Sequence, residues 1–471
     1  MEKRLRSSWK IIILAAAPLL FGLAVLVRHD QYSSTSLAAY SIVLPLASIG
    51  TIVIGRWLGN ETRAAFANYA LAVILALYTV EAILDIDWPS VRPALGFGDY
   101  RPLPHPVAMD GTAYDRRSRY EVVADLRQRL PGKQIVGQFN PEQIVDMGFP
   151  KGLKETNGDY ILPLGGPSHS LVVTCNEMGY WGSFQSDRFG FNNPDRIWDS
   201  KPKIAIIGSS HTQGLCLRPG EGWVDRFREA YPDVVNLGQS NSGPLYQFAL
   251  IREYLFDVKP KDIIWVFCDC FDHRALDIEL ANATLSRYLN DPAFSQHLKE
   301  KQALIDSLEV PFIEERNTRL FRLYQVARDG LTLFMRNWPT LVEVRQNLKA
   351  MIGIKIEQKE ASLPVDDGSD YSDYRNVMTA AKKYVGSWGG RIHVVYLPAV
   401  EYSAARTSSP YRRKIRTVAK DLGLTFTDLF ESFDRLPNPA ALHPFGTKGH
   451  LTPEGYRFIS DAIAADLGPN S

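Results

Sequence analysis

The chain has 471 residues, 45% of them hydrophobic and 22% charged, which is enough for about two or three domains with a large core. Its 53 lysines and arginines nearly balance 52 aspartates and glutamates, so the composition excludes the strong basic field that nucleic-acid-binding proteins carry. Its four cysteines form neither a CxxC pair nor a zinc-ligand spacing, so we expect no bound metal and no other cofactor.

Three apolar segments follow one another at the start of the chain: Ile11–Val27, Leu37–Ile54 and Ala64–Leu84. Each is close to the ~20 residues that a helix needs to cross a bilayer. A cleaved signal peptide would explain only the first segment, and three buried helices of a globular protein are the alternative. We therefore predict three transmembrane helices that anchor residues 1–87 in the cell membrane.

The charged residues around these segments predict their orientation. Four basic residues precede the first segment and two acidic residues follow the third (Lys3, Arg4, Arg6 and Lys10; Asp85 and Asp87). Because basic residues favour the cytoplasmic side, we expect the N-terminus in the cytoplasm and everything after about residue 85 outside it. The predicted location is thus the cell membrane, with a C-terminal part that is extracytoplasmic, or periplasmic.

Residues 88–200 predict a linker followed by a small mixed α/β region. Residues 88–110 contain five prolines, which indicates an extended connector. The stretch 119–130 has a helical period, and 170–193 alternates apolar and polar residues as short strands do. We expect this region to lie between the membrane anchor and a larger domain.

From Pro202 onwards the chain alternates between strands and helices. Short apolar runs are expected as strands and amphipathic runs between them as helices (204–207, 234–237, 262–267, 392–397 and 424–426; 223–230 and 245–256). This alternation predicts an α/β fold with a doubly wound parallel sheet, in which functional groups lie at the carboxyl ends of the strands. The predicted domain covers residues 201–471, with a charged helical insertion at about 275–372.

The sequence leaves the pairing of the cysteines open. Cys268 and Cys270 are two residues apart in an apolar run. On a strand their side chains would share one face, which does not favour a disulfide between them.

The stretch IAIIGSSHTQG places two serines, Ser209 and Ser210, directly after the first strand of the predicted sheet. A serine that acts as a nucleophile needs a base and donors for the oxyanion. His450 is the candidate base, because it lies at the same edge, in a loop before a helix that Thr452 and Pro453 begin. A histidine that only packs this loop is the alternative.

Gly238, in NLGQSNSGP, follows the second strand, and its N–H could face the serine; a simple turn glycine is the alternative. The order of Gly-x-Ser, Asn-x-Gly, an acidic third block and HLTPEGY resembles the SGNH, or GDSL-like, hydrolase family over residues 200–470. This resemblance implies a flavodoxin-like sheet, with Ser210 as nucleophile and His450 as base. It also implies that the N–H groups of Ser210 and Gly238 are oxyanion donors.

The motif blocks depart from the family pattern at three positions. Ser209 replaces the aspartate of Gly-Asp-Ser, and Phe271 replaces an asparagine that supplies an oxyanion donor. Thr447 replaces the aspartate that normally precedes and orients the histidine. Another acid must then hold the base, and we favour Asp428 at the end of a strand over Asp272 after the third strand. A helix-capping or loop-tying role is the alternative for Asp428.

Two classes of function follow from these residues. The first is a membrane-anchored esterase, deacylase or acyltransferase that uses Ser210 on an acylated glycan or other ester outside the cytoplasm, such as a cell-envelope polysaccharide and its modification machinery. The second is a catalytically degenerate SGNH-like module that binds a polysaccharide or a partner protein. A phosphate-binding loop is disfavoured, because the turn lacks the glycine spacing and the lysine of a P-loop.

Overall fold

The computed structural model describes Thr62 and eight further parts of the chain: residues 107–139, 152–155, 158–270, 272–316, 371–399, 406, 408–446 and 449–468. Contacts divide the chain into two compact units. One unit consists of Met1–Phe97 and Arg322–Ala361, and the other of Gly98–Phe321 and Ser362–Ser471. Apart from Thr62, all described residues belong to the second unit, which is the one considered below. The predicted domain limits stay predictions.

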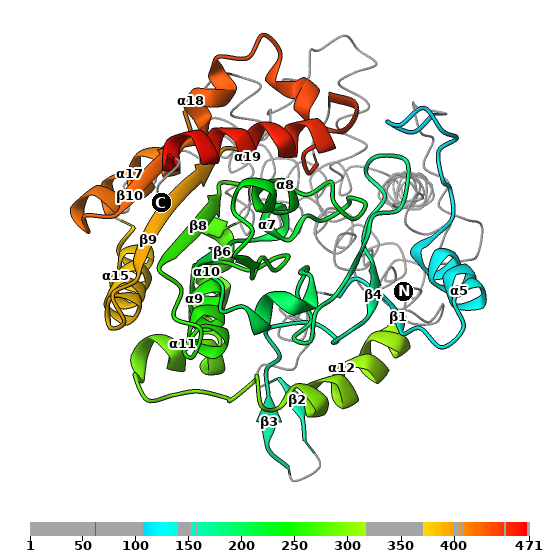
Figure 1. Ribbon diagram of the computed structural model, residues 1–471, viewed down its shortest axis with the longest axis horizontal. Helices are drawn as coiled ribbons and strands as arrows, with labels where there is room; N and C mark the ends of the chain where they lie inside the picture. Colours follow the sequence, from blue (N-terminus) through cyan, green and yellow to red (C-terminus); the bar gives the residue numbers. More distant parts are fainter. Residues whose placement is uncertain are drawn as a thin grey trace. The chain divides into compact units, whose positions relative to one another are not determined.

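A five-stranded parallel sheet forms the centre of this unit (Figure 1). Its strands are β6 (Ile204–Ile207), β7 (Val234–Asn236), β8 (Asp262–Cys268), β9 (Arg391–Leu397) and β10 (Thr425–Asp428). They are ordered β7-β6-β8-β9-β10, which in chain order is 2-1-3-4-5, the order of flavodoxin-like sheets. Every pairing is parallel, so the carboxyl ends of all five strands meet at one edge.

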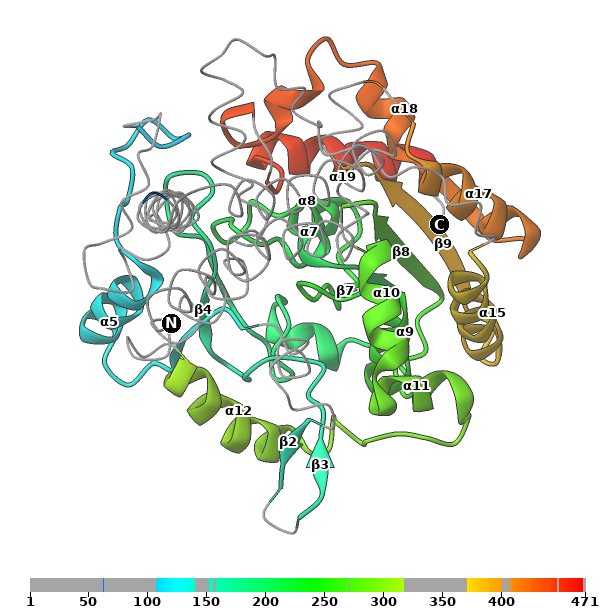
Figure 2. The ribbon, with the colours of Figure 1, turned by 180° about the vertical axis from the view of Figure 1, so that it is seen from behind.

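Helices cover both faces of the sheet, because its strands are apolar on both sides. In β6, Ala205 and Ile207 pack into a core with α9 (Pro244–Tyr254), α15 (Ser372–Gly386) and α17 (Pro410–Asp421). Ile204 and Ile206 pack on the opposite face with α8 (Trp223–Ala230), α18 (Leu429–Asp434) and α19 (Pro453–Leu467). Figure 2 shows the same arrangement from behind.

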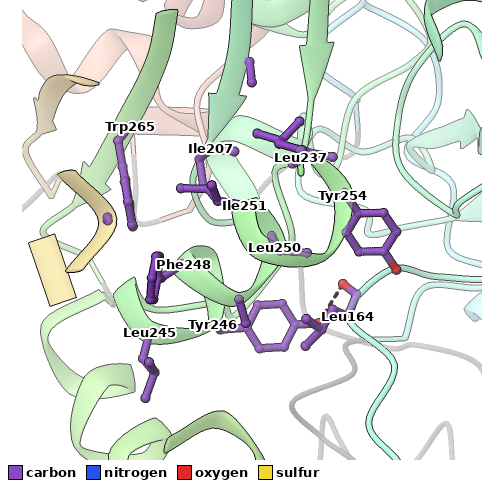
Figure 3. Close-up of a cluster of buried hydrophobic side chains, with 14 of the residues drawn as sticks. Leu164, Ile207, Leu237, Leu245, Tyr246, Phe248, Leu250, Ile251, Tyr254 and Trp265 are labelled. Carbon is purple, nitrogen blue, oxygen red and sulfur yellow. Dashed lines mark hydrogen bonds between the residues drawn. The ribbon is translucent and has the colours of Figure 1, made fainter. Parts of the chain in front are cut away.

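The first of these cores is centred on α9, all of whose residues are buried (Figure 3). Trp265 of β8 packs there and donates its indole N–H to Gln247 of the helix. The hydroxyl of Tyr246 donates to the Leu164 carbonyl at 2.7 Å, which ties the helix to the preceding chain. Because each large apolar side chain buried in this way contributes about 1.5–3 kcal/mol, this cluster fixes the strands whose ends carry the site.

The remaining elements precede the sheet, join its strands or follow its last strand. A three-stranded sheet of order β1-β4-β5 and a hairpin of β2 and β3 precede it, together with α5. Their bounds are α5 (Arg119–Arg129), β1 (Ile135–Gly137), β2 (Leu153–Lys154), β3 (Tyr160–Ile161), β4 (Leu171–Val173) and β5 (Ser183–Gln185). The other helices are α7 (Ser210–Gln213), α10 (Asp272–Ala281), α11 (Ala283–Asn290) and α12 (Gln302–Arg316), with 3-10 turns η2 (Asp195–Asp199), η4 (Pro439–Leu442) and η5 (Pro444–Gly446).

The predicted fold class is wrong where it places three transmembrane helices before the sheet. Among the described residues, no helix is long and apolar enough to cross a membrane. The longest of these helices, α12, α15 and α19, have 15 residues each, fewer than the ~20 that a bilayer requires. The three apolar segments on which the prediction rested lie outside the described residues.

Candidate active site

Ser210 lies where β6 turns sharply into the short helix α7. Ser209 precedes the helix in an extended conformation, and Gly214 ends the helix in the left-handed region. Gly208 allows this turn, because a Cβ at that position would lie 2.3 Å from Oγ1 of Thr212. The turn presents Ser210, half-buried, at the carboxyl edge of the sheet.

The structure brings Ser210 and His450 together, as the sequence led us to expect. His450 Nε2 lies 2.8 Å from Ser210 Oγ, although the two residues are 240 positions apart. His450 is set in place by α19, whose N-cap Thr452 accepts a hydrogen bond from the Gly455 N–H. The distance is that of a base poised to take the hydroxyl proton.

Ser209 does not face the histidine. Its side chain is 2% exposed and lies against the buried carboxyl of Asp272. Burial raises the pKa of Asp272 well above its usual value, while the Cys268 N–H and the side chains of Gln247 and Ser209 act against that shift. Asp272 therefore belongs to the interior beneath the turn, and of the two serines only Ser210 is positioned to react.

Glu177 holds the other side of the His450 ring. Its Oε1 and Oε2 lie 3.0 and 3.1 Å from His450 Nδ1, and Oε2 accepts the backbone N–H of His450 at 2.7 Å. Because a carboxylate only accepts, Nδ1 carries the proton and Nε2 is free to accept from Ser210. The three side chains thus form a Ser–His–Glu series, an arrangement in which a carboxylate can stabilise the imidazolium that forms if a serine hydroxyl gives its proton to the ring.

The expectation that Asp428 orients the histidine is wrong. Its carboxylate forms ion pairs with Arg412, at 2.8 Å, and with Arg416, and it caps α18 by accepting the Phe430 N–H at 3.2 Å. The capping alternative is therefore what the structure shows. Asp428 does end a strand at the correct edge, but β10 is the edge strand of the sheet, two strands away from β8 and three from β6.

Sequence reasoning missed Glu177 because it lies before the parallel sheet, in the region assigned to a small leader. It belongs to the β4–β5 loop, residues 174–182. Two cysteines carried the only signal: Cys175 is two residues from Glu177, Cys216 is six residues from Ser210, and they form a disulfide. A predicted Cys175–Cys216 bond would have brought the two segments together.

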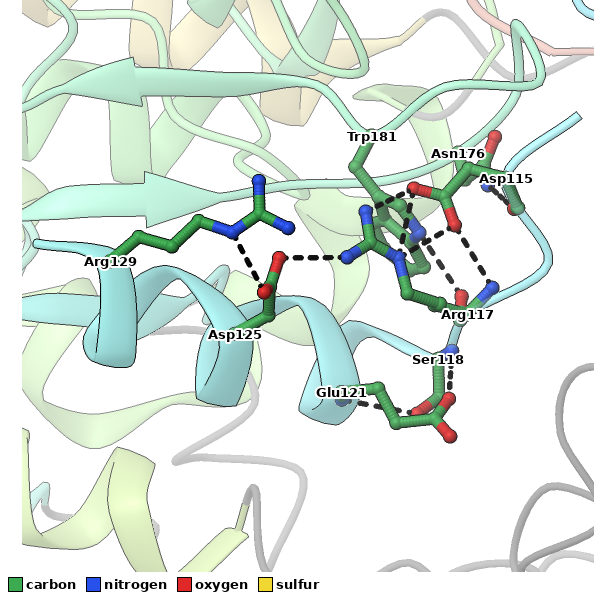
Figure 4. A network of polar contacts seen from close by, with 8 residues as sticks. All are labelled: Asp115, Arg117, Ser118, Glu121, Asp125, Arg129, Asn176 and Trp181. Carbon is green, nitrogen blue, oxygen red and sulfur yellow. Dashed lines mark hydrogen bonds and ion pairs between the residues drawn. The ribbon is translucent and has the colours of Figure 1, made fainter. Parts of the chain in front are cut away.

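Hydrogen bonds hold the outer side of the β4–β5 loop (Figure 4). Asn176 donates its side-chain amide to the Asp115 carbonyl at 2.6 Å, and Trp181 donates its indole N–H to the Arg117 carbonyl at 3.1 Å. Arg117 in turn pairs with Asp115 and with Asp125 of α5. The loop that carries the acid is therefore fixed against the segment that leads into α5.

Beneath the site lies a second disulfide, Cys268–Cys270, which corrects the expectation that these cysteines do not bond. β8 ends at Cys268, so Cys270 has left the strand and the shared-face argument no longer holds. His211 Nδ1 lies 3.7 Å from Cys268 Sγ and 3.9 Å from Cys270 Sγ, and its ring centroid is 4.9 Å from that of His450. Burial, together with nearby His450, lowers the pKa of His211 well below its usual value, so this imidazole is neutral.

Two groups of described residues bring metal-ligand atoms within 4.8 Å of one another. They are Cys175, Glu177, Cys216 and His450, and His211, Cys268 and Cys270. In both groups the sulfur atoms belong to disulfides, whereas metals bind thiolates. Either group could hold a metal through sulfur only after reduction.

Gly238 does not have the open N–H that an oxyanion donor needs. Its N–H donates to Asn236 Oδ1 at 2.8 Å. A Cβ at this position would lie 2.4 Å from Gln213 N and 2.5 Å from Thr212 C, both backbone atoms of α7. Gly238 therefore permits close packing of the β7 turn against α7. The N–H of Ser210, at the first position of α7, is left as a backbone donor beside the hydroxyl.

Gly238→Ala is expected to destabilise the protein by about 1–3 kcal/mol, because the added methyl group overlaps backbone that cannot move without displacing α7. Thermal and urea unfolding followed by circular dichroism measure this effect. Gly386→Ala is the matched control, since a Cβ there meets nothing within 4 Å and the position is helical. Equal stability of the two variants would contradict the packing role.

Two further positions from the sequence analysis, Phe271 and Thr447, lie outside the described residues. The losses of an oxyanion donor at position 271 and of an orienting acid at position 447 therefore stay predictions. Compared with family models and with curated proteins, the chain gives no match to either.

Proposed function

We propose that this protein is a serine-dependent ester hydrolase or acyltransferase of the SGNH-like type. The observation that carries the proposal is the series of contacts from Ser210 Oγ to His450 Nε2, at 2.8 Å, and from His450 Nδ1 to Glu177, at 3.0 Å. A nucleophile, a base and an acid that orients the base are the parts that acyl transfer by a serine requires. Here they come from three segments that are far apart in the sequence.

In the proposed reaction, Ser210 Oγ attacks the acyl carbonyl while His450 Nε2 takes the hydroxyl proton. His450 then gives this proton to the leaving alcohol, which leaves the acyl group on Ser210. Water, in a hydrolase, or a hydroxyl of an acceptor, in a transferase, loses its proton to His450 and takes the acyl group, and His450 returns the proton to Ser210 Oγ as the acyl–serine bond breaks. Glu177 remains ionised throughout and keeps the Nδ1 proton in place. The Ser210 N–H supplies one donor to the oxyanion.

The proposed substrate is an acylated glycan or another ester outside the cytoplasm. Two disulfides support this location, because disulfides persist mainly in oxidising compartments. Both disulfides lie next to the site, so the site residues would lie in the same oxidising compartment as the disulfides. Acylated polysaccharides of the cell envelope are the class of substrate found there that carries suitable esters.

The alternative is a module that binds such a polymer without turning it over. It is supported by Gly238, whose N–H is already bonded to Asn236 and so adds no second backbone donor to the site. The loss of one oxyanion donor lowers turnover by about 10²–10³.

Labelling with a fluorophosphonate tests the proposal, because a serine that a base has activated displaces fluoride from this probe and forms a stable phosphonate ester. We expect one labelled peptide, which contains Ser210, and competition by acetyl esters. Heat-denatured protein is the control for unspecific labelling. Absence of label on folded protein would favour the binding module.

A further inference from the structure

We infer that the Cys175–Cys216 disulfide positions the catalytic acid, so that activity depends on the oxidation of these two cysteines. This inference rests on the proposed function, in which Glu177 orients His450. Cys175 and Cys216 act through Glu177 and are therefore positioning residues. No step of the reaction itself involves their sulfur atoms.

The disulfide joins the two segments that the site has to align. Cys175 lies in the β4–β5 loop two residues before Glu177, and Cys216 follows α7, which carries Ser210. The two Cα atoms are 4.6 Å apart, and Cys216 Sγ lies 3.4 Å from His450 Nδ1. The bond therefore places the start of the loop directly beside the ring that Glu177 contacts.

Around the disulfide the same two segments are in close backbone contact. The Cys216 N–H donates to Thr174 Oγ1 at 3.2 Å, and the Ser183 N–H donates to the Leu217 carbonyl at 2.8 Å. A Cβ at Gly182 would lie 2.5 Å from Cys216 C, so the approach leaves room for glycine alone. These contacts hold the two ends of the loop, and the disulfide adds a covalent bond on the Glu177 side.

The backbone of Cys216 gives a reason why the covalent bond matters. Cys216 has a φ of 64°, in the left-handed region that is unfavourable for a residue other than glycine. Once the sulfur atoms separate, the segment after α7 can relax from this conformation. The Glu177 side chain is 31% exposed, so its carboxylate can then hydrogen-bond to water in place of His450.

Reduction would be a thiol–disulfide exchange with a protein dithiol. Each sulfur of the disulfide gains one electron and one proton, and the two thiols of the reductant lose them and form a disulfide. The reverse exchange, with an oxidised partner of the same class, forms the bond after the chain reaches an oxidising compartment. The acid would therefore be in place only where such partners are oxidised.

The test compares the full-length parent with a Cys175→Ser/Cys216→Ser variant, using turnover of an acetyl ester at several pH values. We expect kcat to fall about 10²-fold, as a displacement of about 1 Å in a catalytic group can cost, and the pH profile of kcat to change as it does in Glu177→Gln. Adding the cysteine substitutions to Glu177→Gln is expected to cause little further loss, because both act through one contact. The inference would be overturned if the double cysteine variant kept the kcat and the pH profile of the parent. It would also be overturned if the losses from the cysteine substitutions and from Glu177→Gln multiplied in the combined variant.

A second measurement does not depend on activity. The His450 N–H donates to Glu177, so its hydrogen exchange reports whether the acid is in place. We expect about tenfold faster exchange in the peptide that contains His450 in the double variant, and also in the folded parent after mild reduction with a phosphine. Unchanged exchange in both would refute the positioning role. If exchange becomes faster on reduction but the untreated parent is not labelled by a fluorophosphonate, the positioning role is supported and the proposed function is rejected.

Mild reduction of the parent also covers the case in which the double variant does not fold. The Cys268–Cys270 bond is the second target of the reductant, and mapping by mass spectrometry identifies which disulfide has opened. A Cys268→Ser/Cys270→Ser variant, exposed to the same phosphine, then shows the effect of opening Cys175–Cys216 by itself. An activity loss of the parent that tracks the opening of Cys268–Cys270 alone would contradict the assignment to Cys175–Cys216.

Discussion

Ser210→Ala is expected to lower the turnover of an acetyl ester by a factor of about 10³–10⁶ while leaving the protein folded. The substitution removes the only hydroxyl that lies against His450 Nε2 among the described residues, and water is a poor replacement for an aligned nucleophile. Initial rates with a chromogenic acetyl ester at neutral pH measure the effect, and thermal unfolding shows that the variant is folded.

Ser209→Ala is the matched control for this result. Ser209 is the neighbouring serine, but its side chain is buried against Asp272 and does not contact the histidine. We expect its removal to change the unfolding free energy by less than about 1 kcal/mol, because its buried Oγ makes no hydrogen bond that the substitution would break, and to change turnover little. If Ser209→Ala is inactive and Ser210→Ala is active, the assignment of the nucleophile is wrong. If neither variant differs from the parent, the protein does not use this site as an esterase.

Glu177→Gln is expected to lower kcat by about 10⁴, the effect of a comparable change in another serine triad. The amide keeps the size of the side chain but cannot offset the charge of the His450 imidazolium. It can also present an N–H to Nδ1, which would then carry no proton, so that Nε2 is protonated and can no longer accept from Ser210. The pH dependence of kcat, measured beside that of the parent, shows the loss.

Asp428→Asn is the control for Glu177→Gln, because it also replaces one carboxylate at the same edge of the sheet. Its partners are Arg412 and Arg416, so we expect a loss of about 1–3 kcal/mol in stability and parental turnover. The opposite pattern, with activity lost in Asp428→Asn and kept in Glu177→Gln, would return the orienting role to Asp428. It would require His450 to turn away from its present partner.

Local patterns in the sequence placed Ser209, Ser210 and His450 at one edge of the predicted sheet, and the family resemblance then singled out Ser210 from the two serines. The apolar run before Gly208 predicted a buried strand, and the Thr452–Pro453 pair predicted the start of a helix, so both flanking loops were assigned to the edge where parallel strands end. That edge is common to all strands of a parallel sheet. Ser210 and His450 could therefore be paired across 240 residues without knowing the strand order.

The acid could not be found in this way, because its position depends on packing between elements with no shared sequence pattern. Glu177 lies in a hairpin loop outside the parallel sheet, and only the contact of that loop with the segment after α7 brings it to His450. The same is true of Gly238. The sequence suggested its N–H as an oxyanion donor, but in the folded protein this N–H donates to the side chain of Asn236. Hydrophobic periodicity and capping residues act over a few positions and so determined the strands, the helices and the residues at their ends. Which loops meet, which cysteines bond and which N–H groups stay free was decided by the tertiary structure, since those contacts form only when distant segments pack together.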